Sequence, residues 1–114
     1  MDPLAEATRT ALDLVLDPAE RVERVMVAVG CTLVLTDRQL VLVRDGAEHR
    51  PRSGVRSWPL DRELSLRLAS GRQGAGRLVI ERAGLSASAF LTVAQVAEAH
   101  TLIAETRRRI YVDD

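Results

Sequence analysis

The spacing of hydrophobic residues changes twice along the chain, and each change marks a different type of secondary structure. At the N-terminal end apolar positions recur at helical spacing, which predicts an amphipathic helix over residues 1–17. Pro3 suits the first turn of a helix, and Asp17–Pro18 predicts its end, because a residue before proline avoids the α-helical region. The apolar positions are Leu4, Ala7, Ala11, Leu12 and Val15. Helical spacing returns from Val93 onward and predicts a second helix.

Between the two helices, seven short segments have the composition of β-strands. They are rich in valine and leucine and are bounded by turn residues. In the clearest one, residues 64–69, leucines alternate with Ser65, Arg67 and Ala69, as in a strand with one buried face. Pro59 ends the fourth segment or places it at a sheet edge. The segments are residues 21–29, 32–36, 39–44, 55–58, 64–69, 77–82 and 86–92.

Seven antiparallel strands of this length cannot form a stable flat sheet with one exposed face. We therefore expect them to curl into two packed sheets or a partly open barrel, in a mainly β (α+β) fold. The C-terminal helix has its apolar face at Val96, Ala99, Ile103 and Ile110. This face must cover an open end or edge of the barrel, because the helix has no other surface to bury against. The extra N-terminal helix can pack on its own barrel or on a second chain.

Two motifs in the strand region resemble a known family. The run Val34–Gly46, which contains the turn Thr36–Arg38, resembles the second hairpin of bacterial pleckstrin-homology-like (PH-like) and GRAM-like domains. Trp58–Asp61 is similar to the segment where those domains enter their second sheet, and seven strands followed by a helix is also their order of elements. The resemblance covers residues 20–111 and implies a single PH-like domain there, with the N-terminal helix added to the family's pattern.

The same resemblance argues against one mode of lipid binding. Lipid-binding members of the family hold phosphoinositide headgroups with a long, basic loop between their first two strands. In this sequence only Gly30 and Cys31 stand at that connection. The resemblance therefore implies the fold of the family and not its headgroup site.

Composition and charge narrow the range of partners. The 114 residues are 46 % hydrophobic and 28 % charged, which fits one globular domain. Sixteen basic residues, all arginine, balance sixteen acidic ones, and aromatics are only 3 %, which argues against nucleic-acid binding by bulk charge or by base stacking. Residues 1–20 carry one arginine and five acids, net −4, whereas residues 21–60 carry seven arginines and four acids, net +3. The acidic leading helix can therefore dock on the basic barrel of its own chain or of a second chain.

The main candidate for a binding site is the basic loop between the third and fourth predicted strands. Its basic side chains outnumber its two acids, Asp45 and Glu48. Arginine makes bidentate contacts with phosphate and carboxylate, so the loop can bind an anionic partner. Alternatively, it is a solvated loop with local ion pairs. The candidate binding residues are Arg44, His49, Arg50, Arg52 and Arg56.

Three further motifs have structural interpretations. In the Thr36–Arg38 turn, Asp37 is expected to bond its own backbone while Arg38 braces a neighbouring loop. The glycine-rich segment Gly71–Gly76 lacks the Lys-Ser/Thr ending of a phosphate-binding loop and is predicted to be a hairpin loop. The arginines of Arg107–Arg109 are expected to stabilise the end of the last helix, with a membrane-surface or nucleic-acid patch as the alternative.

Histidine and cysteine do not form a recognisable catalytic or metal site. His49, His100 and Cys31 are too few and too widely spaced for a zinc site or for a nucleophile with its base. Cys31 is expected to be a buried small residue. We therefore predict a non-enzymatic domain without metal or cofactor. A cytoplasmic location is expected, because the sequence shows no signal peptide and no apolar run long enough to span a bilayer.

The predicted function is that of a PH-like domain for protein–protein interaction or self-association. The alternative is a membrane-surface or anionic-ligand module that uses the Arg44–Arg56 loop, with an anionic lipid headgroup as the partner. Nucleic acid is not expected as a partner.

Overall fold

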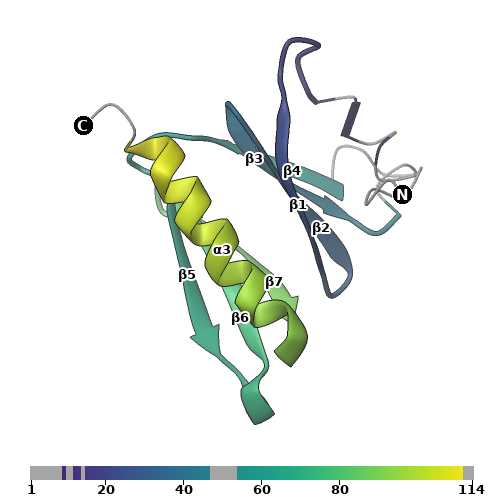
Figure 1. Cartoon of the computed structure of the whole chain (residues 1–114), viewed down its shortest axis with the longest axis vertical. Coiled ribbons are helices and arrows are strands. Elements are labelled where there is room, and N and C mark those ends of the chain that lie inside the picture. The colour runs from purple at the N-terminus through teal and green to yellow at the C-terminus, as the bar shows by residue number, and fades with distance from the viewer. Residues whose placement is uncertain (1–8, 10–11, 14, 47–53, 112–114) are drawn as a thin grey trace.

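The computed structural model describes residues 9, 12–13, 15–46 and 54–111. Among them, seven strands are followed by one long helix (Figure 1). The helix predicted over residues 1–17 falls mostly outside the described residues and stays a prediction. The elements are β1 (Val22–Ala28), β2 (Cys31–Thr36), β3 (Gln39–Arg44), β4 (Val55–Pro59), β5 (Ser65–Ser70), β6 (Gly76–Arg82), β7 (Leu85–Leu91) and α3 (Val93–Ile110).

The strands form two antiparallel sheets that pack against each other. The first has the order β1-β2-β3-β4 and the second the order β5-β6-β7. An isolated backbone bridge joins them where β1 meets β7, with the N–H of Val29 2.9 Å from the carbonyl oxygen of Phe90. The prediction of seven antiparallel strands in two packed sheets is confirmed.

Most strand boundaries differ from the predicted ones by one residue, and two of these differences involve turn residues. Cys31 begins β2 instead of lying in the first turn, which is made by Val29 and Gly30. Gly30 has a φ of 73°, in the left-handed region that favours glycine. Pro59 is the last residue of the edge strand β4, a position where a missing N–H costs little.

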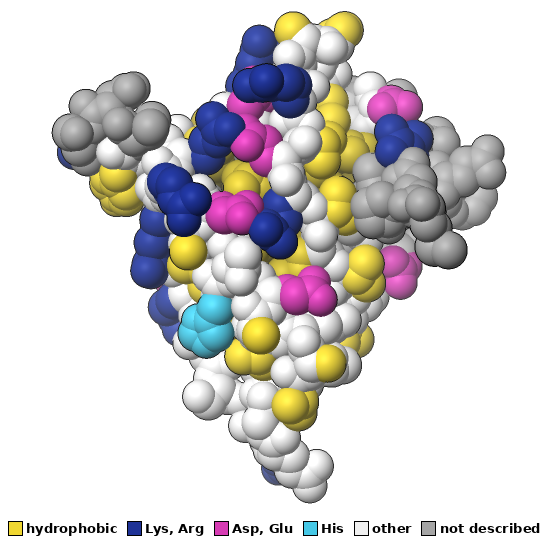
Figure 2. Space-filling view, viewed as in Figure 1, with side chains coloured by type: hydrophobic (Ala, Val, Ile, Leu, Met, Phe, Trp, Pro, Cys, Tyr) yellow, Lys and Arg dark blue, Asp and Glu magenta, His cyan; other side chains and the backbone are white. Residues whose placement is uncertain are grey.

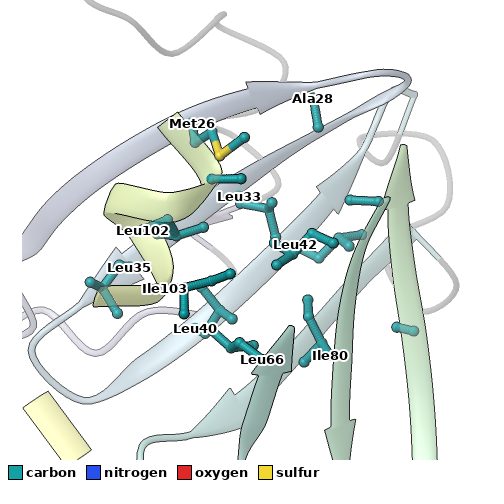
Figure 3. Close-up of a cluster of buried hydrophobic side chains, with 14 of the residues drawn as sticks. Met26, Ala28, Leu33, Leu35, Leu40, Leu42, Leu66, Ile80, Leu102 and Ile103 are labelled. Carbon is teal, nitrogen blue, oxygen red and sulfur yellow. The ribbon is translucent and has the colours of Figure 1, made fainter. Parts of the chain in front are cut away.

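The main core lies between the two sheets, and α3 covers one end of it (Figure 3). Alternate residues of each strand point inward, because successive side chains of a strand lie on opposite faces. The core side chains labelled in Figure 3 are Met26, Ala28, Leu33, Leu35, Leu40, Leu42, Leu66, Ile80, Leu102 and Ile103. The last helix therefore covers an open end of the barrel, as its apolar face predicts.

The buried face of α3 is wider than the predicted stripe. Two of the four predicted positions are buried, and the other two pack at the margin of the core. Leu102 and Thr106 complete the face, and both are fully buried. The Thr106 hydroxyl donates to the Leu102 carbonyl oxygen at 2.7 Å, so the helix backbone satisfies this buried polar group.

The middle of the outer face of the first sheet is also buried. Val34, Val41 and Val43 point away from the main core, yet each has an exposed fraction of 1 % or less. An antiparallel sheet usually leaves one face to water, so full burial requires a cover. Leu12 and Leu16, from the segment before β1, pack against these valines and form a second, smaller core within the same chain.

Candidate functional site

The predicted arginine loop is described only at its two ends. His49, Arg50 and Arg52 lie outside the described residues, so their role stays a prediction. Arg44 is exposed at the end of β3, and Arg56 is half-buried in β4. Directly opposite residues on paired strands share a face of the sheet. Arg44 lies opposite Cys31 of β2, and Arg56 lies opposite Leu42 of β3, and both of these partners belong to the main core. Both guanidinium groups therefore belong to the inner side of the first sheet, at the end nearest the loop.

Arg56 lies over an aromatic ring at the rim of a cavity. Its guanidinium carbon is 5.4 Å from the centre of the Trp58 ring, a cation–π distance. The cavity has a volume of about 350 Å³ and is also lined by Arg82 and Leu85. It opens between β4 and the turn that joins β6 to β7.

The two arginines that line this cavity differ in whether they form ion pairs with carboxylates. Arg82 binds Asp61, with Nε 3.2 Å from Oδ1, and its Nη2 lies 3.6 Å from Oε2 of Glu63. This hydrogen bond lowers the pKa of Asp61 and raises the pKa of Arg82. Within the described residues, no carboxylate lies at ion-pair distance from Arg56 or Arg44. Among the described members of the predicted site, Arg44 and Arg56 can therefore receive an anion without giving up a carboxylate partner.

The Thr36–Arg38 turn has the structural role predicted for it, but its residues share the hydrogen bonds differently from the prediction. The Thr36 hydroxyl oxygen accepts hydrogen bonds from the backbone N–H groups of Arg38 at 3.1 Å and Gln39 at 3.0 Å. Asp37 Oδ1 accepts chiefly from the N–H of Arg21 at 2.9 Å, which lowers the pKa of Asp37. Arg38 reaches Asp17 at 3.6 Å and so braces the neighbouring segment.

Glu20 completes this cluster, and sequence analysis missed it. Its carboxylate accepts hydrogen bonds from the Thr36 hydroxyl and from Gln39 Nε2, the latter at 3.0 Å. Thr36 and Gln39 lie 16 and 19 positions after Glu20 in the sequence, so no local sequence pattern indicates these contacts. The turn therefore anchors the segment that carries Leu12 and Leu16 onto the first sheet.

Ion pairs tie α3 to β1. Glu105 accepts two hydrogen bonds from Arg24, at 2.7 and 2.6 Å, and Arg109 pairs with Glu23. Figure 2 shows basic and acidic side chains side by side on the surface above the C-terminal half of α3. The hydrogen bonds from Arg24 lower the pKa of Glu105. Of the three terminal arginines, Arg109 thus has a specific partner on β1 in addition to the general role predicted at a helix end.

Acid should destabilise the domain over a defined pH range. Glu105, Asp61 and Asp37 each have a lowered pKa in the folded chain, because each carboxylate accepts hydrogen bonds that its protonated form loses. Their contribution to stability is complete above the unfolded pKa of about 4 and is lost as the pH falls through the folded values. We expect the Tm from thermal scans to be flat above about pH 5.5 and to fall steadily below about pH 4.

Glu105→Gln separates one of these contributions from the others. The variant should have a lower Tm than the natural chain at neutral pH and a shallower loss of Tm in acid, because it lacks one of the titrating groups. Asp45→Asn serves as the control, because Asp45 is exposed and makes no ion pair among the described residues. Parallel curves for Glu105→Gln and the natural chain would contradict the assignment.

Two cavities lie between β5 and α3, one at each end of the strand, and together they are called the β5–α3 groove. The first cavity, about 210 Å³, lies beside Leu66 and Arg107. The second, about 490 Å³, lies beside Leu68, Val96 and His100, and its floor includes several glycines of the β5–β6 hairpin. Figure 1 shows α3 passing beside β5 along this side of the molecule.

The edge of β5 that faces this groove has no partner strand within the described residues. In the hairpin, Gly71 N–H bonds the Ala75 carbonyl oxygen at 2.8 Å, and ladder bonds then alternate back along the strand. By this alternation Leu66, Leu68 and Ser70 turn their N–H and C=O groups away from β6 and toward the free edge. Arg107 Nη2 donates to the Leu66 carbonyl oxygen at 3.1 Å, which agrees with that orientation.

The β5 edge was not found by sequence analysis. The alternation in residues 64–69 predicts the strand correctly, but sheet order decides whether a strand is an edge. Arg107 and Leu66 are 41 positions apart, so nothing local to Arg107–Arg109 indicates the contact.

Cys31 and His100 have different surroundings. Cys31 is buried, as predicted, and burial raises the pKa of its thiol. His100 is exposed on α3. Among the described residues, no cluster of histidine, cysteine and carboxylate side chains has the arrangement of a metal site. In the same part of the chain, none of the helices has both the length and the apolar character of a membrane span.

Comparison with known proteins identifies the fold. No family model matches the chain, and no curated protein matches it. A solved structure does: the pleckstrin homology domain from Shewanella amazonensis SB2B superposes with a TM-score of 0.57 at 16 % sequence identity, covering 89 % of this chain and 97 % of that one. The chain therefore has the PH-like fold, as the resemblance of its hairpin and strand order implies.

Proposed function

We propose that this PH-like domain is a non-enzymatic module that binds another polypeptide, either a protein partner or a second copy of the chain. The observation that carries the proposal is the free edge of β5 between two cavities against α3. A free edge offers a row of backbone donors and acceptors, which an extended segment can pair with, and flanking cavities receive its alternate side chains. Residues 20–111 form the module in this proposal, and it works in the cytoplasm.

Selection of binding peptides tests the proposal. A display library of random peptides about ten residues long would be selected on the immobilised full chain, and the winners mapped by NMR chemical-shift changes. We expect enriched peptides to shift the amides of Leu66, Leu68 and Ser70. Failure to enrich any peptide, or shifts confined to other surfaces, would contradict the proposal. Light scattering then separates the two partners: a concentration-dependent dimer that the peptides dissociate identifies a second copy, and a monomer identifies a different protein.

A second candidate function is binding of an anionic ligand at the end of the first sheet nearest the β3–β4 loop. Arg44 and Arg56 support it, because neither has a carboxylate partner within the described residues and both lie on one face. His49, Arg50 and Arg52 belong to the same proposed site through the sequence alone.

Sedimentation with vesicles tests this second function. If it is correct, the chain binds vesicles of phosphatidylserine and phosphatidylcholine at low salt, where electrostatic attraction between exposed charges is strongest. Arg44→Ala with Arg56→Ala should weaken that binding, whereas Arg67→Ala, whose guanidinium is already paired with Glu81 on the second sheet, should not. Absence of binding at low salt excludes a lipid surface, and inorganic phosphate or a soluble acidic peptide then tests the free anion.

A further inference from the structure

We propose that two copies of the chain pair face to face at the seam where β1 meets β7, through a patch formed by Val27, Val29 and Phe90. The seam and the β5–α3 groove lie at opposite edges of the second sheet. The inference therefore goes beyond the proposed function and does not depend on peptide binding at β5. It names a second copy of the chain as the partner, together with the residues that make the contact.

The patch consists of three exposed apolar side chains that adjoin on the outer surface of the two sheets. Val29 and Phe90 are directly opposite in the bridge between the sheets, so they share a face. Val27 lies two residues before Val29 and therefore on the same side of the chain. The exposed fractions of Val27, Val29 and Phe90 are 52, 52 and 61 %. Single exposed apolar residues are common, but a group that adjoins indicates a contact surface.

The backbone at the seam is already paired. The Val29 N–H donates to the Phe90 carbonyl oxygen at 2.9 Å, and Figure 1 shows the end of β7 beside the turn between β1 and β2. A partner at this place therefore packs on the side chains and does not add a strand to either sheet.

Charged side chains of opposite sign lie at the two ends of the patch. Arg77 lies directly opposite Phe90 on β6. Asp45 lies beyond Val29, where its N–H donates to the Gly30 carbonyl oxygen at 3.0 Å. Both charged side chains are exposed, and neither forms an ion pair with another described residue. The order along the surface is thus a cation, an apolar centre and an anion.

This order is complementary to itself under a two-fold axis. An axis between Phe90 and Val29 sets the ring of one copy against the valines of the other. The same rotation brings Arg77 of each copy toward Asp45 of the other. The whole chain has no net charge, so two copies do not repel each other. The charge pattern therefore favours a second copy over a partner that carries charge of one sign.

The dimer is expected to be weak, because three apolar side chains make a smaller contact than the interfaces of stable complexes. With a dissociation constant of about 0.5 mM, the chain is a monomer at about 10 µM and mostly a dimer at about 2 mM. NMR spectra and translational diffusion recorded across this range measure the association. The amide signals of Val27, Val29 and Phe90 should move with concentration, and diffusion should slow.

Phe90→Ser tests the apolar contact. It should raise the dissociation constant by about tenfold or more, because the ring is buried only between the copies. Leu85→Ser is the matched control, since Leu85 is 67 % exposed at the other end of the same strand. The control should associate as the natural chain does. Urea unfolding of each variant confirms that the fold is retained.

Exchange of the two charges tests the pairing between copies. Arg77→Asp or Asp45→Arg alone should weaken the dimer about tenfold, because each places like charges together twice in a symmetric dimer. The double variant restores both pairs with reversed sign and should return to within about threefold of the natural dissociation constant. An equal mixture of the two single variants should likewise associate as the natural chain does, because each variant supplies the partner charge that the other needs.

The outcomes separate this inference from the function proposed for β5. A chain that stays monomeric at the highest concentration overturns it, and so does a dimer that Phe90→Ser leaves intact or that charge exchange does not restore. Each of these results leaves peptide binding at β5 unaffected. A dimer that β5-binding peptides dissociate would also contradict the inference, because it would form through the β5–α3 groove.

Discussion

Replacing Leu102 with alanine should lower the free energy of unfolding by about 3 kcal/mol. Leu102 has an exposed fraction of 0 % and lies where α3 meets the inner faces of both sheets (Figure 3). The substitution removes buried apolar surface and leaves a cavity that the surrounding strands cannot fill, because two sheets and a helix fix its walls. Urea denaturation followed by circular dichroism measures the change.

The matched control is Val93→Ala on the same helix. Val93 is 61 % exposed, so its truncation should change stability by less than about 0.5 kcal/mol. A loss at Leu102 no larger than the loss at Val93 would mean that α3 does not contribute to the core as described.

Leu12→Ala should cost about 2 kcal/mol. Leu12 has an exposed fraction of 2 % and packs on Val34, Val41 and Val43 across the outer face of the first sheet. Its truncation removes apolar contacts with these valines and lets water approach them. Val15→Ala, in the same segment but 38 % exposed, should cost much less.

The Leu12 measurement also decides how the N-terminal segment is used. If it packs on its own chain, the loss is independent of protein concentration and the chain stays a monomer by light scattering. A loss that depends on concentration would instead show that the segment covers a second chain. Equal stability of Leu12→Ala and the natural chain would contradict any role for the segment as a cover.

Local sequence patterns predicted the elements of this fold well, because each pattern reflects one buried face. The leucine alternation around Leu66 and the apolar stripe around Ile103 both correspond to buried faces. The central runs of β2 and β3, Leu33–Leu35 and Leu40–Val43, are apolar at every position, and such unbroken runs are typical of strands buried on both faces. Such patterns do not specify which strands become edges.

The candidate binding surfaces were predicted less completely for the same physical reason. The arginine loop is a continuous segment, so its charge is visible in the sequence, and Arg44 and Arg56 do lie on one face. The β5–α3 groove is made by residues that meet only after the sheets close, as Arg107 and Leu66 do. Charge counts also treat every arginine alike, although Arg82 and Arg24 pair with carboxylates and Arg56 has no such pair among the residues that the structure describes.

The contact between β1 and α3 has a consequence for how the domain is made in the cell. Arg24 and Glu105 are 81 positions apart, and the bridge from Val29 to Phe90 also joins the first strand to the last. During synthesis, nearly the whole domain must therefore leave the ribosome before the first strand can contact these partners. Contacts of such high sequence separation slow folding, because a long loop must close before they form. Until the second sheet and α3 have emerged, the inner leucines of the first sheet lack the side chains that bury them in the folded domain.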